Sequence, residues 1–198
     1  MKRIFLTLAI AFSIVALQNC GNANNDSKKT ADSINEANTP ANIGDRDVTT
    51  TPIDVSEDDA KFVTEAANGG MTEVELGKLA QQKGQHADVK AFGEMMVKDH
   101  SKANDEIATL AQSKNITLPA TLGAEEQNLK DELSKKSPSD FDKSYIEAMV
   151  NDHEKDVKLF ENASKNLKDA DLKMFVDKTL PTLRSHLEHA KSTKEKLK

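Results

Sequence analysis

The feature that most constrains this chain is an apolar helical repeat with a histidine inside it. In FGEMMVKDHSKANDEI (92–107), apolar side chains recur every three or four residues, which is the spacing of one face of an α-helix. His100 falls on that face. A similar segment, YIEAMVNDHEKDVKLF (145–160), places His153 on an apolar face, and six of its residues match the first segment at a constant offset. Both segments indicate buried helices that carry polar groups into a core.

The same periodicity predicts four long helices and one short helix. The break NITLPATLG (115–123) contains Pro119 and loses the period, so it reads as a connection that crosses the molecule. Helix-start signals stand at Ser56, Pro138 and Asp169. The predicted long helices cover 56–83, 86–114, 137–167 and the region from 169, and the short one covers 124–135. No strand pattern appears, so we expect an all-α four-helix bundle of two antiparallel hairpins, with the short helix in the crossover.

Two details of these helices bear on their packing. Gly69 and Gly70 interrupt the first helix with residues that weaken a helix in isolation, which favours a kink or a close approach of another helix. Pro181 should kink the last helix locally because proline removes a backbone donor.

The N-terminal third divides into two segments before the helical domain, which we place at residues 56–198. Residues 1–20 have a basic start, an apolar run and Cys20, the pattern of a lipoprotein signal in which the cysteine carries the lipid. An ordinary secretory signal with an incidental cysteine is the alternative. Residues 21–55 are rich in polar residues and show no apolar period, so we expect a flexible tether. The prediction is an exported protein anchored to the membrane, periplasmic or on the outer membrane.

Composition limits the chemistry that the domain can support. Cys20 is the only cysteine, so a metal site in the domain must use His, Asp and Glu. The net charge of −6, the absence of tryptophan and the lack of a basic cluster argue against nucleic-acid binding. No organic cofactor is indicated, because no phosphate-binding loop appears. A homodimer stays open.

Each predicted long helix carries one metal-competent side chain on its apolar stripe. In the first hairpin, Glu73 lies 12 residues before Gln85 and His100 lies 15 after it. In the second, His153 lies 16 residues before Asp169 and His186 lies 17 after it. At about 1.5 Å per residue, the members of each hairpin differ in height by only about 5 Å and about 2 Å. All four side chains can therefore meet in one layer of the bundle.

Three imidazoles and a carboxylate suit zinc, copper or iron. The alternative is a structural hydrogen-bond network, because buried polar groups need partners whether or not a metal binds. Asp99 and Asp152 precede two of the histidines and are candidates for further ligands or for partners that orient an imidazole; a solvated acidic edge is their alternative. His189 and His86 fall outside the site. The nearby methionines, soft ligands for copper(I), are more typical of core filling. They are Met95, Met96 and Met149.

The ordered motifs GGMTEVELGKLA, VKAFGEMMVKDHSKAN, FDKSYIEAMVNDHEKDVKLF and LPTLRSHLEHA resemble the ferritin-like bacterial envelope proteins of domain of unknown function 4142. The resemblance covers about residues 57–195. It implies a ferritin-like four-helix bundle in an exported protein, often described as a membrane protein, and implies no established activity. It carries over five motif positions: Glu73, Asp99, His100, His153 and His186.

The chain departs from di-iron ferritin-like proteins, which use Glu-x-x-His motifs. Val97, Val150 and Leu183 stand where those glutamates would be. Three hypotheses follow: a bundle that binds one transition-metal ion for storage, sensing or redox protection; a metal-dependent enzyme of unknown substrate; and a structural or partner-binding lipoprotein without a metal.

Overall fold

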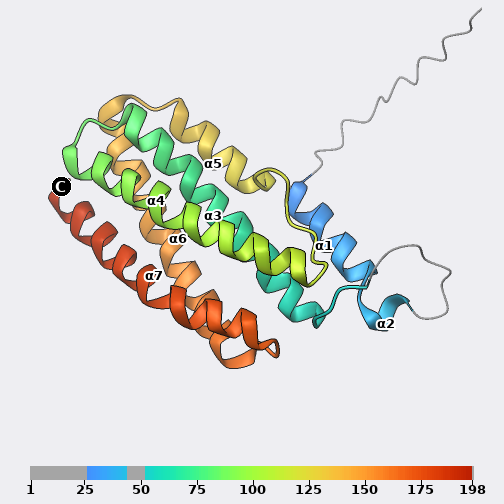
Figure 1. Ribbon diagram of the computed structural model, residues 1–198. Helices are drawn as coiled ribbons and strands as arrows, with labels where there is room; N and C mark the ends of the chain where they lie inside the picture. The colour runs from blue at the N-terminus through green and yellow to red at the C-terminus, as the bar shows by residue number, and fades with distance from the viewer. Residues whose placement is uncertain (1–25, 44–51, 198) are drawn as a thin grey trace, which may run out of the picture.

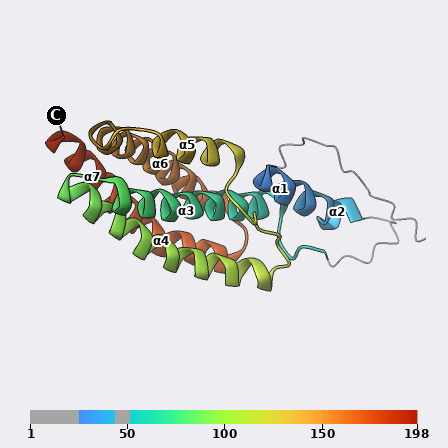
Figure 2. The same cartoon turned by 90° about the horizontal axis from the view of Figure 1, so that it is seen from above.

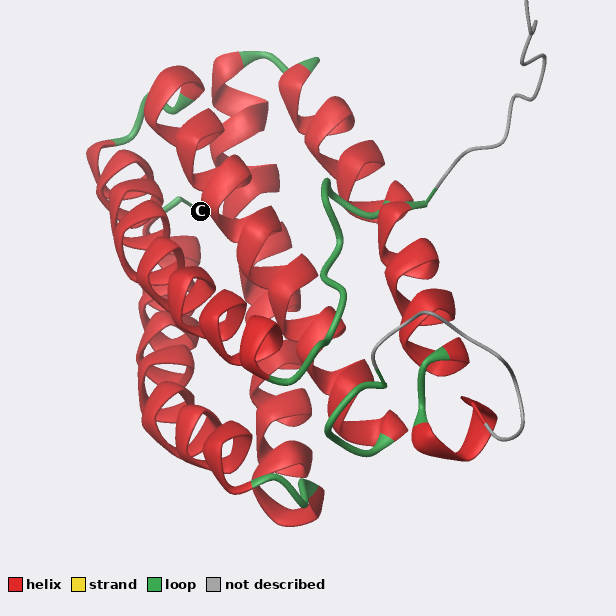
Figure 3. Ribbon diagram, turned by 45° about the vertical axis from the view of Figure 1, so that its right-hand side comes forward, coloured by secondary structure: helices red, strands yellow, loops and turns green. Residues whose placement is uncertain are grey.

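The protein is described by a computed structural model that covers residues 26–43 and 52–197. In these ranges every regular element is a helix and no strand is present (Figures 1 and 3). The helices are α1 (Ser27–Ala37), α2 (Pro40–Ile43), α3 (Glu57–Lys83), α4 (Ala87–Ser113), α5 (Ala124–Ser134), α6 (Pro138–Asn166) and α7 (Ala170–Lys196).

Four long helices form the bundle as two antiparallel hairpins, α3 with α4 and α6 with α7. The hairpins meet through α3 against α6 and α4 against α7. Helix α5 lies in the crossover beside α3 and α6, as Figures 1 and 2 show. The predicted all-α bundle with a short helix in the crossover is confirmed.

Local sequence signals explain where these helices begin. Ser56 and Ser137 are N-caps whose hydroxyls accept from the backbone N–H three residues on, at Asp59 and Asp140. Asp169 caps α7 in the same way. Helix α7 continues through Pro181 as a single helix to Lys196.

The two hairpins are related by a constant offset of 83 residues that is set by their turns. Gly84 and Leu167 end α3 and α6 with the same backbone conformation, φ −58° with ψ 142° and φ −58° with ψ 137°. Each turn is held by a buried aspartate from the other hairpin. Asp142 accepts from the backbone N–H of His86 at 2.8 Å, and Asp59 accepts from that of Asp169 at 2.9 Å.

This quasi-symmetry clarifies the match between segments 92–107 and 145–160. Those segments lie on α4 and α6, which occupy different positions in their hairpins, so their likeness reflects a shared local role. The structural counterpart of α3 is α6, and that of α4 is α7.

A close approach of α3 and α4 depends on two glycines. A Cβ added at Gly77 would lie 2.7 Å from the carbonyl oxygen of Gly93, and one added at Gly93 would lie 2.7 Å from that of Gly77. The two backbones therefore touch where any side chain would separate them.

The prediction of a flexible tether over 21–55 is wrong for the part that the structure describes. Helix α1 packs against α3, and Asn35 is 3 % exposed. The Asn35 amide donates to the Thr117 carbonyl at 2.9 Å and accepts from the Thr117 N–H at 2.8 Å. Asp32 accepts from the Thr64 hydroxyl on α3. Polar side chains dock this helix, which explains why an apolar period did not reveal it.

The apolar core has two parts. One contains Phe62, Ile107, Phe160, Phe175 and Leu183, and the other contains Leu76, Phe92, Met96, Tyr145 and Leu187. Along each long helix, the residues of one part give way to those of the other near the middle. The buried polar side chains of the next section lie at this boundary. None of the helices in the described ranges combines the length and hydropathy that a membrane-spanning helix needs.

Candidate metal centre

The four side chains expected to share a layer do lie together, one from each long helix. Glu73 (α3), His100 (α4), His153 (α6) and His186 (α7) have exposed fractions of 1 %, 5 %, 0 % and 2 %. Each sits between residues of the two core parts; on α7, for example, His186 lies between Leu183 and Leu187. The polar layer is therefore surrounded by apolar packing on both sides.

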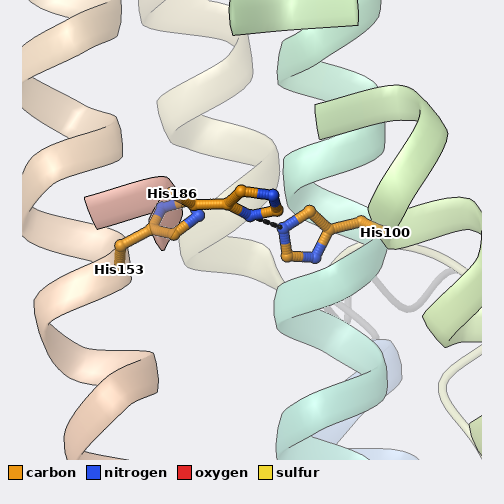
Figure 4. Close-up of side chains that lie close together, drawn as sticks. All are labelled: His100, His153 and His186. Carbon is orange, nitrogen blue, oxygen red and sulfur yellow. Dashed lines mark hydrogen bonds between the residues drawn. The ribbon is translucent and has the colours of Figure 1, made fainter. Parts of the chain in front are cut away.

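The three imidazoles converge. One ring nitrogen from each of His100, His153 and His186 lies within 4.8 Å of the other two. The Nε2 of His100 and the Nδ1 of His186 are 3.3 Å apart. Figure 4 shows the three rings pointing toward one another from their separate helices.

The other ring nitrogen of each histidine faces an oxygen. His153 Nδ1 lies 2.9 Å from the carbonyl oxygen of Met149, one turn earlier on α6. His186 Nε2 lies 3.0 Å from Asp99 Oδ2, and His100 Nδ1 lies 2.6 Å from Glu73 Oε2. Oxygen acceptors at these positions hold a proton on the outer nitrogen and leave a lone pair on the inner one.

Burial keeps all three imidazoles neutral near pH 7. Desolvation lowers the pKa of His100 to about 4 and that of His186 to about 4. Desolvation, together with the neighbouring imidazoles, lowers the pKa of His153 to about 3. Neutral imidazole is the form that binds metal ions.

Glu73 joins the imidazoles to a second group of titratable side chains. Its Oε1 lies 3.2 Å from His153 Nε2. Carboxylate oxygens of Glu73, Asp152 and Asp156 lie within 4.8 Å of one another. Burial raises the pKa of all three carboxyl groups, that of Asp152 to about 6, and their mutual repulsion adds to the rise in the pKa of Glu73 and Asp156.

The two aspartates singled out from the sequence take different places. Asp99 contacts the imidazole of His186 on another helix rather than that of its neighbour His100. Asp152 faces Glu73 and Asp156. Sequence reasoning missed Asp156, although one signal was available: it is the counterpart of Glu73 at the offset of 83 that also relates Asp59 to Asp142.

The remaining histidines and methionines lie as expected. His189 is exposed and packs edge-on against Phe92, with ring centroids 5.6 Å apart. His86 is the N-cap of α4. Met96 and Met149 are fully buried in the core, and Met95 packs against it half-buried. Cys20 lies outside the described residues.

Comparison with known proteins identifies the family. Residues 47–193 match the model of the domain of unknown function DUF4142, so the chain belongs to this family. A search of curated proteins finds no match.

Solved structures share the fold at low sequence identity. CopM in the Cu(II)-bound form is 16 % identical, with a TM-score of 0.61 over 71 % of this chain and 97 % of that one. CopM in the Cu(I)-bound form is 18 % identical, with a TM-score of 0.58 over 68 % and 93 %. A DUF305 fragment from Deinococcus radiodurans is 9 % identical, with a TM-score of 0.64 over 72 % and 98 %. At these identities the likeness establishes the fold alone.

Proposed function

We propose that this DUF4142 protein binds one transition-metal ion through His100, His153 and His186, and that copper is the first candidate. The observation that carries the proposal is the convergence of three neutral, buried imidazoles whose outer nitrogens all face oxygen acceptors. Histidines that ligate metals in proteins characteristically donate their other ring N–H to a carboxylate or a carbonyl oxygen.

The spacing of the inner nitrogens fits one ion. Metal–nitrogen bonds of about 2.0–2.1 Å place two ligating nitrogens about 3.3–3.6 Å apart in tetrahedral or trigonal geometry. His100 Nε2 and His186 Nδ1 are already 3.3 Å apart. The third nitrogen lies within 4.8 Å of both, so a displacement of about 1 Å, well within a side-chain adjustment, completes the set.

Proton bookkeeping also favours a cation between the rings. A neutral His186 has one N–H, which it can donate to Asp99 or to His100 but not to both. His100 Nδ1 holds a proton toward Glu73, so its Nε2 presents a lone pair. If His186 donates to Asp99, two lone pairs face each other at 3.3 Å. A bound metal ion accepts both lone pairs and removes the conflict.

His153 adds a further sign of an unmet ligand. Its Nε2 is fully buried and makes no hydrogen bond with any described residue, and the same holds for Glu73 Oε1. Burying polar atoms without partners costs on the order of 1–3 kcal/mol each. Coordination of the nitrogen by a metal would satisfy it.

The choice of copper rests on the donor set and on the neighbouring fold. Imidazole donors suit copper, zinc and iron. CopM, which shares the fold, is described in Cu(II)-bound and Cu(I)-bound forms. A protein with this site would serve copper storage, sensing or protection against redox damage.

The location in the cell is part of the same proposal. The basic start, the apolar run and Cys20 in residues 1–20 support export and lipid anchoring to the cell envelope. In a Cys20→Ser variant expressed in a bacterial host, we expect the protein to leave the membrane fraction. Continued membrane association would refute the lipid anchor.

Metal titration of the full chain tests the site. We expect one Cu(I) or Zn²⁺ per chain in competition with a chromophoric chelator, and a loss of at least about tenfold in affinity for His153→Gln, since even an outer partner of a ligand contributes 10–100-fold. His189→Gln removes an exposed histidine near the same helix face and is the matched control. Equal affinity in the two variants would instead support a structural network.

A further inference from the structure

Three carboxylates form a cluster beside the imidazoles. Asp152 and Asp156 lie one turn apart on α6, and Glu73 faces them from α3. One oxygen from each lies within 4.8 Å of the other two. The imidazole site as proposed uses Glu73 only to orient His100, so this cluster is not explained by that site.

The carboxylates and the histidines follow different structural rules. Glu73 and Asp156 are counterparts under the offset of 83, so each hairpin contributes one carboxylate at equivalent places. The histidines break that relation. The counterparts of His100, His153 and His186 are Leu183, Gly70 and Ala103. The carboxylate pair therefore belongs to the architecture of the two hairpins, independently of the imidazoles.

The cluster has acceptor atoms without donors. Glu73 Oε1 and Asp152 Oδ2 are buried and make no hydrogen bond with any residue that the structure describes. The ion pairs of Glu73 are with His100 and His153 alone, and none joins Asp152 or Asp156 to a lysine or arginine within the described ranges. Buried carboxylates are ordinarily paired with a cation or coordinate a metal ion.

Space next to the cluster is also provided. A cavity of about 20 Å³ is lined by Gly70, Glu73, His100, Asn104 and Asp156, among others, which is room for one water-sized species. A Cβ added at Gly70 would lie 2.1 Å from Asn104 Oδ1. The bare glycine thus lets an amide oxygen approach the cavity wall, where it adds a neutral oxygen donor.

We propose that Glu73, Asp152 and Asp156 form a second cation site for a hard divalent ion, with Glu73 standing between it and the three imidazoles. Carboxylate, amide and water oxygens are the donors that Mg²⁺, Ca²⁺ and Mn²⁺ prefer, whereas imidazole suits copper and zinc. The bundle would then hold two ions of different chemistry in one polar layer. This inference goes beyond the proposed function and does not rest on it.

Mn²⁺ is the probe for this site, because the six-line electron paramagnetic resonance signal of the aquated ion is lost on binding. The full chain is titrated with Mn²⁺ as wild type, as Asp152→Asn/Asp156→Asn and as His186→Gln. The double variant keeps all three imidazoles, and His186→Gln keeps all three carboxylates. Circular dichroism checks that each variant is folded; should the double variant lose helix content, Asp152→Asn alone replaces it.

We expect wild type and His186→Gln to bind one Mn²⁺ per chain with similar affinity. The double variant should bind at least about tenfold more weakly, since it loses the charge of two direct ligands. Competition by Mg²⁺ or Ca²⁺ but not by Cu(I) would further support a hard-cation site. No binding by wild type at millimolar Mn²⁺, or equal binding by the double variant, would overturn the inference. Loss of Mn²⁺ in His186→Gln alone would place the ion on the imidazoles, which refutes this inference while leaving the proposed function standing.

Discussion

Asp99→Ala tests whether the imidazoles are held in place for a metal or only for packing. Asp99 Oδ2 lies 3.0 Å from His186 Nε2, and its carboxylate is the acceptor that keeps the inner nitrogen of His186 free. Its side chain is 35 % exposed, whereas that of His186 is 3 % exposed. Removing the carboxylate therefore alters the orientation and tautomer of a buried ring through a residue near the surface.

The expected magnitude follows from this geometry. Loss of an outer partner of a ligating histidine typically lowers metal affinity 10–100-fold, which corresponds to about 1.4–2.7 kcal/mol. Because Asp99 is partly exposed, water can replace some of its hydrogen bonding, so we expect a loss near the lower end, about tenfold. Folding stability should change by less than about 1 kcal/mol, since exposed ion pairs contribute little.

The assay is a chelator competition for Cu(I) or Zn²⁺, with thermal unfolding measured in parallel. Asp105→Ala is the control, because it removes an exposed carboxylate from the same helix that has no ion pair in the described chain. Affinity that is unchanged in Asp99→Ala, or lowered equally in Asp105→Ala, would refute the orienting role of Asp99. A large loss of stability without loss of affinity would favour a structural network.

Further predictions concern the fold and the response of the site to pH. Gly77→Ala should lower the free energy of unfolding by on the order of 1–3 kcal/mol, because its Cβ would lie 2.7 Å from the Gly93 carbonyl oxygen; Gly69→Ala, with ordinary contact at 3.5 Å, should be neutral or stabilising in the same denaturant titration. Asp59→Ala should cost on the order of 2–3 kcal/mol in chemical denaturation, because it leaves backbone N–H groups of the α6–α7 turn without an acceptor, and a cost near zero would show that water replaces it. Since burial lowers the pKa of His100 to about 4, protons should compete with the metal only as the pH falls toward that value, so occupancy should hold from pH 8 to pH 5; release centred near pH 6.5 would indicate exposed ligands.

The helical architecture was largely accessible from the sequence, because its signals are local. The caps at Ser56, Ser137 and Asp169, together with the apolar period, place the long helices close to their observed bounds. The turns then determine the heights of Glu73, His100, His153 and His186, since rise per residue is constant along a helix. That these four side chains meet was therefore predictable, while metal binding by them stays a prediction.

What could not be read from the sequence depends on contacts between distant segments. Helix α1 is docked by polar bonds such as that of Asn35 to Thr117, and such bonds leave no periodic pattern. The partner of Asp99 is on another helix for the same reason. Asp156 differs, because the offset that relates Asp59 to Asp142 would have found it had the turns been aligned first.

Elemental analysis of the untagged full chain, as purified from a bacterial host, tests the central claim most directly. Wild type and His153→Gln are purified side by side and measured for copper, zinc and iron. The account predicts close to one transition-metal ion per chain in wild type and its loss in the variant. A chain that carries no metal and takes up none on addition of copper or zinc, or a variant that retains the ion, would contradict it.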